Sequence, residues 1–501
     1  MNIQEAKEEI RKTVEIYLEK DDFGEYAIPF MKQRPIFMIG APGIGKTAVV
    51  EQIAAEMGIG LVSYSMTHHT RQSAIGLPYI VKKEYGGEEL RVSEYTLSEI
   101  IASVHEVIDK TGRTEGILFL DEINCVSETL APAILQFLQY KTFGGHSLPK
   151  GWVVVSAGNP PQYNRSVREF DIATRDRLKY ITVEEDYEVW KKYAYDRGIH
   201  AAIIAFLEVN RSWFYSIKTT IDGPRFATAR GWEDLSYAVK MYERKGFEVG
   251  ASFIGEYITD MDIARKFAVF YDLFKKYRED YQVVAILEGK QEKKVEERAA
   301  AARFDERIAL IEMIAEALGQ EFGTVLEEQA VLEGAAAILR VAKKEAGGTE
   351  SARALHEKVI ERESVKKEEE ISSGQRANSM SADEIRIGRK VIRELGDYQV
   401  SDKAADATAQ FALWKKKFDQ RAKKQARQLD STGDKLENAF SFMENVWGEG
   451  QELTYFMTIL TSGHVSSSFL AKHGSPKYFE HNKNLLLFDV KEQLRKEILL
   501  L

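Results

Sequence analysis

The residues best suited to chemistry form a glycine-rich segment, residues 40–47 (GAPGIGKT), which matches the phosphate-binding pattern GxxxxGK followed by Ser or Thr. An apolar run at 35–39 precedes it and predicts a short buried strand, and apolar residues at helical spacing follow it. Glycines there can adopt backbone angles that turn successive N–H groups toward phosphate oxygens, and the helix dipole adds partial positive charge. The segment therefore predicts a nucleoside triphosphate site, with Lys46 on the β and γ phosphates and Thr47 offering its hydroxyl to Mg²⁺. The residues expected to contact the nucleotide are Gly40, Ala41, Pro42, Gly43, Ile44, Gly45, Lys46, Thr47 and Ala48.

Two adjacent carboxylates follow a second apolar run. Residues 117–120 predict a buried strand, and Asp121 and Glu122 come directly after it. If this strand lies beside the glycine-rich loop, Asp121 can hold Mg²⁺ through its water shell, and Glu122 can orient and polarise an attacking water. An ordinary strand end entering a solvated turn gives the same pattern, but the loop upstream favours the catalytic interpretation.

A third apolar run, residues 153–157, leads to the amide side chain of Asn159. An amide at this position could hydrogen-bond both the γ-phosphate and the lytic water. Asn-Pro is also a common turn former. The order of glycine-rich loop, acidic strand and asparagine strand favours the functional interpretation.

Bulk composition is typical of a large soluble protein. The chain has 501 residues and one cysteine, Cys125, so an intrachain disulfide and a four-cysteine zinc site are both excluded. We expect a cytoplasmic protein without membrane insertion, because the N-terminus lacks a secretory apolar stretch and no run of about 18 apolar residues occurs. The net charge of −9 argues against nucleic acid as a default partner.

The pattern of apolar residues predicts an α/β fold: a P-loop parallel sheet core with inserted β-hairpins, followed by an α-helical lid and an α-helical C-terminal region. The expected domains are the core at 1–185, the lid at 186–288, a charged helical extension at 289–435 and a C-terminal helical unit at 436–501. The lid pattern is helical throughout.

Strands and hairpins of the core are predicted individually. Alternating polar and apolar residues at 77–95, around a Gly-Gly pair, predict one inserted hairpin, and residues 140–151 predict a shorter one. The strands expected in the sheet are residues 36–39, 61–66, 117–120, 153–157 and 180–183.

Three segments, GAPGIGKT, ILFLDEIN and AGNPPQYN followed by TRDRL, resemble the AAA+ ATPases, specifically their MoxR-like branch. The resemblance covers about residues 25–285 and does not extend to the C-terminal two-fifths of the chain. It implies that Lys46 and Thr47 hold the Walker A positions, Asp121 and Glu122 the Walker B positions, and Asn159 the sensor 1 position.

The same resemblance implies two functional arginines. Arg177 matches the arginine that such proteins donate to the γ-phosphate of a neighbouring subunit, and Arg175 is its nearby competitor. The alternative for Arg177 is a surface ion pair with a neighbouring aspartate. Arg230 matches sensor 2 at the start of a lid helix, with Arg225 as the alternative, or with a capping or packing role.

From the resemblance we expect hydrolysis of ATP with Mg²⁺ in a ring, expected to be a hexamer, since an arginine acting in trans leaves a monomer incomplete. The work done would be remodelling of a protein partner, and the partner class implied is one with a von Willebrand factor A domain. Two other functions remain open: a nucleic-acid-stimulated motor, and a nucleotide-gated assembly scaffold that does not hydrolyse ATP.

A basic run in the C-terminal half, residues 414–427, has aromatic residues interleaved with its lysines and arginines. Such a run suits a surface for nucleic acid or for an acidic partner. More often such a run is one solvated helix face, with Phe411, Trp414 and Phe418 turned to the core.

Overall fold

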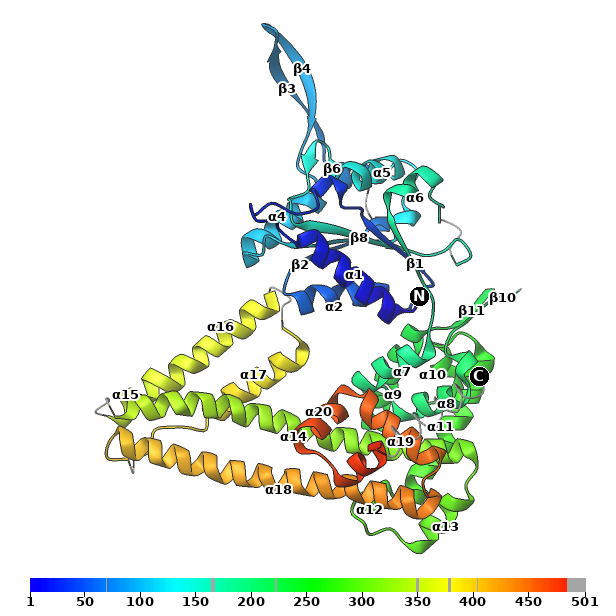
Figure 1. Ribbon diagram of the computed structural model, residues 1–501, viewed down its shortest axis with the longest axis vertical. Helices are drawn as coiled ribbons and strands as arrows, with labels where there is room; N and C mark the ends of the chain where they lie inside the picture. Colours follow the sequence, from blue (N-terminus) through cyan, green and yellow to red (C-terminus); the bar gives the residue numbers. More distant parts are fainter. Residues whose placement is uncertain are drawn as a thin grey trace, which may run out of the picture. The chain divides into compact units, whose positions relative to one another are not determined.

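The computed structural model divides the chain into two compact units, which are described separately (Figure 1). The first unit contains residues 1–189 together with 228–230 and 374–380, and the second contains the remainder. No helix among the described residues has the length and apolar content needed to cross a membrane. The residues described are 1–68, 70–163, 167–220, 223–347, 351–376, 380–402 and 404–483.

A five-stranded parallel sheet forms the centre of the first unit, in the order β2-β5-β8-β1-β9. Its inner strands are apolar on both faces and are buried along nearly their whole length, as expected for a parallel sheet covered by helices. All five predicted strands are confirmed. They are β1 (Ile36–Gly40), β2 (Gly60–Ser65), β5 (Gly116–Asp121), β8 (Trp152–Gly158) and β9 (Lys179–Val183).

Helices on both sides of the sheet complete its apolar core. The first helix begins with a capping box, in which the side chain of Asn2 accepts from the Glu5 N–H and the Glu5 carboxylate accepts from the Asn2 N–H. The helical segments are α1 (Ile3–Leu18), η1 (Phe30–Lys32), α2 (Lys46–Met57), η2 (Met66–His68), α3 (Arg71–Ile75), α4 (Glu99–Thr111), η3 (Ile123–Cys125), α5 (Ala131–Tyr140) and α6 (Ile172–Arg177).

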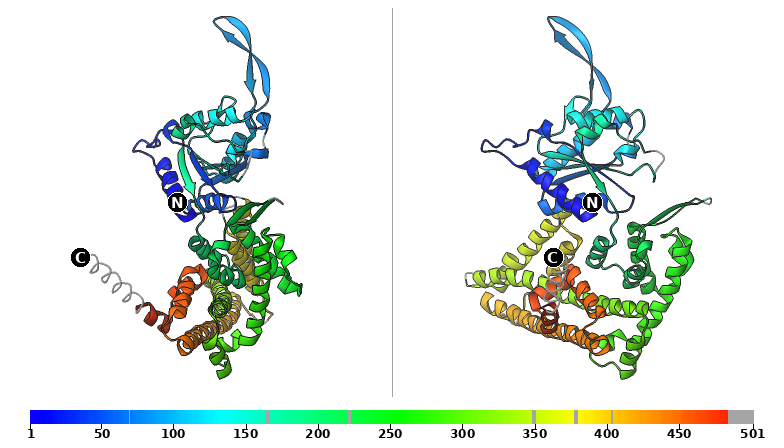
Figure 2. Two further views of the ribbon diagram at one scale, coloured as in Figure 1. Left: turned by 90° about the vertical axis from the view of Figure 1, so that its right-hand side faces the viewer. Right: turned by 45° about the vertical axis from the view of Figure 1, so that its right-hand side comes forward.

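Both predicted hairpins are present in the first unit. Strands β3 (Pro78–Tyr85) and β4 (Glu88–Tyr95) pair across Gly86 and Gly87, which both have positive φ as a tight hairpin turn requires. This hairpin extends well beyond the sheet and its helices (Figure 2). The shorter hairpin joins β6 (Thr142–Phe143) to β7 (His146–Ser147).

The second unit is mainly helical but contains one hairpin that the sequence analysis missed. The prediction of a helical pattern throughout 186–288 is wrong where β10 (Ser216–Thr220) pairs antiparallel with β11 (Gly223–Ala227). β10 carries Ile and two Thr among five residues, a composition that favours strands, and Gly223 has φ +119°. Amphipathic helices on both sides of this short stretch masked its signal.

Two long helices, α14 (Phe304–Ala346) and α18 (Ala407–Trp447), run side by side through the second unit (Figure 2). The predicted long helices of the C-terminal region are therefore confirmed, while the four-part domain division stays a prediction. The other helical segments are α7 (Tyr187–Asp196), α8 (Ala201–Val209), η4 (Arg211–Trp213), α9 (Ala229–Lys245), α10 (Ala251–Gly255), α11 (Met261–Tyr281), α12 (Val283–Leu287), α13 (Lys293–Ala301), α15 (Ala352–Leu355), η5 (His356–Glu361), α16 (Arg362–Arg376), α17 (Ala382–Leu395), α19 (Gln451–Ser462) and α20 (His464–His473).

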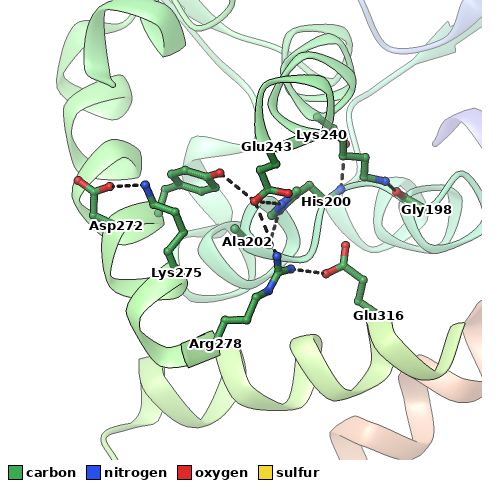
Figure 3. A network of polar contacts seen from close by, with 11 residues as sticks. Gly198, His200, Ala202, Lys240, Glu243, Asp272, Lys275, Arg278 and Glu316 are labelled. Atoms are coloured by element: carbon green, nitrogen blue, oxygen red, sulfur yellow. Dashed lines mark hydrogen bonds and ion pairs between the residues drawn. The ribbon is translucent and has the colours of Figure 1, made fainter. Parts of the chain in front are cut away.

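A partly buried polar network centred on Glu243 ties four helices of this unit together (Figure 3). His200 caps α8 by accepting from the Ala202 N–H through Nδ1, so its Nε2 carries the proton toward Glu243, 3.2 Å away. Tyr271 donates to the same carboxylate at 2.9 Å. Burial would raise the pKa of Glu243, but these hydrogen bonds outweigh it and lower the pKa. Arg278 then connects the network to α14.

Glu312 on α14 is a fully buried carboxyl, with only 1% of its surface exposed. The hydroxyls of Tyr195 and Tyr455 both donate to it, from α7 and α19. Burial raises the pKa of Glu312 to about 7, against an ordinary value of 4.5, although the two hydrogen bonds act in the opposite direction.

Because the folded-state pKa of Glu312 is raised, its protonated form favours folding at low pH, and this contribution is lost as the pH rises from 4.5 through about 7. We expect the free energy of unfolding of the wild type, relative to that of Glu312→Gln, to fall by about 3 kcal/mol across this window. Urea midpoints of the full chain at pH 5 and pH 7.5 measure it. Glu333→Gln, at an exposed position on the same helix, is the control and should track the wild type.

Candidate nucleotide-binding site

The glycine-rich loop joins the end of β1 to the start of α2. Gly43 and Gly45 have φ of +75° and +95°, so both positions favour glycine. Position 40 requires glycine for a steric reason, because a Cβ there would lie 2.6 Å from the carbonyl oxygen of Val183. No side chain caps α2, whose N-cap is Gly45, so the first amides of this helix are available to an anion.

Lys46, the first residue of α2, is only 8% exposed and directs its amine into the loop. The Nζ atom donates to the carbonyl oxygens of Gly40 and Ala41, at 2.9 and 2.8 Å, and to Oδ1 of Asn159 at 3.0 Å. Burial lowers the pKa of Lys46 to about 8, and the charge of Asp121 partly opposes the shift. Lys46 therefore links the loop to the predicted sensor 1 residue.

Thr47 connects the loop to the acidic strand. Its hydroxyl donates to Oδ2 of Asp121 at 2.9 Å, and Oδ1 of Asp121 accepts from the Glu122 N–H at 2.9 Å. A hydroxyl and a carboxylate in contact at the edge of a phosphate-binding loop are hard oxygen donors of the kind that Mg²⁺ prefers. The residues present therefore fit the predicted metal site. Among the described residues, no group of three or more His, Cys, Asp and Glu side chains could hold another metal ion.

Glu122 has an unusual backbone, with φ 55° and ψ 34°, in the left-handed region that non-glycine residues rarely occupy. Its Oε2 accepts from Ser65 Oγ at 3.3 Å and from Thr67 Oγ1 at 3.0 Å. Residues held in such conformations cluster at functional sites. The two hydroxyls fix the direction of the carboxylate that was predicted to activate water.

Ser65 and Thr67 were missed by sequence reasoning. Ser65 is the last residue of β2 and Thr67 lies in η2, directly after it, and β2 pairs with β5 so that Ser65 stands opposite Asp121. The polar residues that follow the apolar part of β2 were a signal that could have been used. Its meaning depends on β2 being the neighbour of β5, which local patterns do not reveal.

Asn159 follows β8 and is held from two sides. Its Oδ1 accepts from Lys46, and its backbone carbonyl accepts from Nδ2 of Asn124 at 2.8 Å. Asn124 is buried and packs against Gly158 so tightly that a Cβ there would lie 2.3 Å from Asn124 Oδ1. Asn124 is thus a third residue that sequence reasoning missed, and it fixes the chain at Asn159.

The candidates for sensor 2 are placed differently. Residues 228–230 group with the first unit, and a Cβ on Gly43 would lie 3.3 Å from Thr228 Cβ and 3.5 Å from Arg230 Cβ. The positive charge of Arg230 also contributes to lowering the pKa of Lys46. Arg225 lies on β11 in the second unit. The structure thus brings Arg230 to the glycine-rich loop.

The two arginines of α6 are both exposed. The guanidinium of Arg175 lies over the ring of Tyr180, 4.5 Å from its centroid, whereas Arg177 donates to the carbonyl oxygen of Ala173 at 3.0 Å. Within the described residues, neither arginine forms an ion pair, and no hydrogen bond joins Arg177 to the loop or to the carboxylates. The structure therefore does not bring Arg177 into the site of its own chain.

The sheet order, the glycine-rich loop after β1 and the carboxylates at the end of β5 have the arrangement of a P-loop domain. Residues 35–178 match the family model of the AAA domain, dynein-related subfamily. The matched segment contains the loop, both carboxylates, Asn159 and α6. This segment is therefore similar to AAA domains, and the similarity includes the residues of the candidate site.

Two further comparisons complete these findings. No curated protein matches the sequence. Among solved structures, a point mutant of the RuvB protein of Thermotoga maritima is similar, with 15% identity, 50% of this chain and 69% of that chain covered, and a TM-score of 0.28. A likeness at this level carries no argument about function.

Proposed function

We propose that this protein is an ATPase that binds ATP with Mg²⁺ on the glycine-rich loop and hydrolyses its γ-phosphate. The observation that carries the proposal is the 2.9 Å hydrogen bond between Thr47 and Asp121. It joins two segments 74 residues apart in the sequence. Thr47 belongs to the loop predicted to bind phosphate, and Asp121 ends the strand predicted to hold Mg²⁺. The match to AAA domains over residues 35–178 supports the same reaction class.

Each residue of the site has a role in this proposal. Mg²⁺, held by Thr47 and Asp121, would neutralise charge on the phosphate oxygens. The Lys46 amine exchanges its contacts with loop carbonyls for contacts with phosphate oxygens, and the uncapped amides of α2 bind the same anion. Asn159 lies within reach of this amine and positions the γ-phosphate.

Glu122 favours hydrolysis over binding alone. A scaffold that only binds ATP has no need for a carboxylate with its orientation fixed, yet Glu122 is held by Ser65 and Thr67 and has a strained backbone. In the proposed mechanism its carboxylate accepts a proton from the attacking water. Arg230, beside the loop, contacts the nucleotide from the start of α9.

We further propose a ring of MoxR-like type, with Arg177 acting on the nucleotide of the next subunit and a protein with a von Willebrand factor A domain as partner. The sequence resemblance supports the branch, the hexamer and the partner class. Support for the trans role of Arg177 comes from its exposure and from the absence of any ion pair with it in the described parts of the chain. Head-to-tail packing that closes on itself gives a ring.

Phosphate release from ATP by the purified full chain tests this function. We expect turnover that requires Mg²⁺, is lost on chelation, and is abolished in Lys46→Ala because the phosphate contacts of the ammonium are removed. Strong stimulation by DNA or RNA that disappears with salt would instead favour the nucleic-acid motor. Equal phosphate release by wild type and Lys46→Ala would contradict the assigned site.

The hydroxyl of Thr67 offers a milder test of Glu122. Thr67→Val keeps the shape of the side chain but removes its hydrogen bond to the carboxylate, so the general base is less well oriented. We expect ATP turnover to fall about tenfold while nucleotide affinity changes little. Thr67→Ser keeps a hydroxyl and should retain most of the activity. Steady-state phosphate release and a fluorescent-nucleotide titration separate the two quantities.

A further inference from the structure

A basic surface on α17 and α18 has no role in nucleotide chemistry. Over residues 415–428, α18 carries seven cationic side chains and a single carboxylate, Asp419, in a chain whose net charge is −9. Like charges three and four residues apart destabilise a helix, so this concentration of cations destabilises α18 unless anionic groups compensate it.

The open question about the aromatic residues of this run is answered by the structure. Trp414 is 2% exposed and donates through Nε1 to the carbonyl oxygen of Gln399 at 3.0 Å. Phe411 and Phe418 pack against the same apolar cluster. The aromatic side chains therefore belong to the core, and the outward face of α18 offers no ring on which a nucleic-acid base could stack.

A groove of about 560 Å³ lies between the two basic helices. Residues of α17 and α18 line its sides, and Thr324, Glu327 and Glu328 of α14 also line it. Arg421 of α18 ion-pairs with Glu328, and also with Glu394 of α17.

Most carboxylates of the groove are already neutralised. Glu327 accepts from Arg386 at 2.7 Å and from Lys390 at 2.8 Å. Burial raises the pKa of Glu327, but the contacts with Arg386 and Lys390 lower it by more, so this carboxylate stays charged and paired. Asp397 is the remaining carboxylate in the groove, and Lys417 donates to its backbone oxygen at 2.8 Å.

Six exposed cations on α17 and α18, of which Lys424 lines the groove, lack carboxylate partners among the described residues. In the described part of the chain no carboxylate lies within ion-pair distance of these cations. Asp419 follows Lys416 by three residues but does not form an ion pair with it. These cations are Arg389 and Arg393 on α17 and Lys416, Lys423, Lys424 and Arg427 on α18.

We propose that this basic face binds an acidic segment of a partner protein. Lys416, Lys423 and Arg427 recur at helical spacing and form a row about 16 Å long, which matches about five residues of an extended peptide. Charge complementarity favours an anionic occupant, while the buried aromatics and the acidic chain as a whole disfavour nucleic acid. The interaction does not depend on the proposed ATPase.

Fluorescence anisotropy of labelled decaglutamate, titrated with the full chain at low salt, tests this proposal. The variant Lys416→Glu, Lys423→Glu, Arg427→Glu should bind about tenfold more weakly or worse, since three exposed ion pairs are replaced by repulsion. The milder variant with Gln at the same positions should fall between it and the wild type. The control, Lys293→Glu, Lys294→Glu, Lys472→Glu, changes the charge equally on other exposed surfaces and should stay within about twofold of wild type.

Three results would overturn the proposal: no binding of decaglutamate by the wild type, an equal loss of binding in the control variant, or tighter binding of an oligonucleotide with ten phosphates than of decaglutamate. Circular dichroism of each variant establishes that its helices are retained.

Discussion

Glu122→Gln should abolish most ATP turnover while leaving nucleotide binding intact. The amide keeps the size of the side chain and can still accept hydrogen bonds from Ser65 and Thr67, but it cannot take a proton from water. Loss of a general base lowers turnover by about a hundred- to ten-thousandfold. Because Lys46, Thr47 and Asp121 are untouched, the affinity for ATP with Mg²⁺ should change by less than about threefold.

Single-turnover phosphate release and equilibrium binding of ATP measure these two quantities. Glu51→Gln removes an exposed carboxylate from the outer side of α2 and should behave as wild type. If Glu122→Gln hydrolysed ATP at the wild-type rate, the carboxylate would not be the base. If instead neither wild type nor Glu122→Gln released phosphate while both bound ATP, the nucleotide-gated scaffold would become the better description.

The nucleotide site could be predicted from sequence wherever its chemistry is carried by consecutive residues. The loop at 40–47 encodes its own geometry, because Gly43 and Gly45 need positive φ and Lys46 begins the helix. The strands of the sheet could be predicted because buried parallel strands are short apolar runs. Asp121 lies at the carboxyl end of its strand, within hydrogen-bond distance of Thr47.

Residues that act through strand order could not be predicted in the same way. Ser65 and Thr67 reach Glu122 only because β2 is the neighbour of β5, and Asn124 holds Asn159 only because β8 lies on the other side of β5. Strand order is a property of the whole sheet and leaves no local signal. The hairpin of β10 and β11 was not predicted for another reason. Five-residue strands between helices are too short to show the two-residue alternation of a strand.

The choice between the two arginines of α6 also required the structure. Arg175 is engaged with Tyr180 of its own chain, while among the described residues the guanidinium of Arg177 is bonded to a carbonyl oxygen of its own helix and to no carboxylate. A guanidinium that must reach another subunit needs to be exposed and released at low cost. The contacts therefore favour Arg177 as the proposed trans arginine.

Mixing two inactive variants should then restore ATP turnover. Arg177→Ala alone is expected to lose about a thousandfold or more, as measured for arginines that stabilise the charge of a transferring phosphoryl group. Lys46→Ala is inactive because it cannot hold the nucleotide. In a mixed ring, a subunit with an intact Lys46 can face a neighbour with an intact Arg177, so an equal mixture should recover about a quarter of the wild-type rate.

The same mixture distinguishes the alternatives. If Arg177 acted within its own chain, each active site would lack one essential residue and no rate would return on mixing. Arg175→Ala is the matched control: it removes a neighbouring guanidinium that rests on Tyr180, so it should keep most of the activity without any mixing. The trans role would pass to Arg175 on two results together. Arg175→Ala alone would have to lose activity, and mixing it with Lys46→Ala would have to restore turnover.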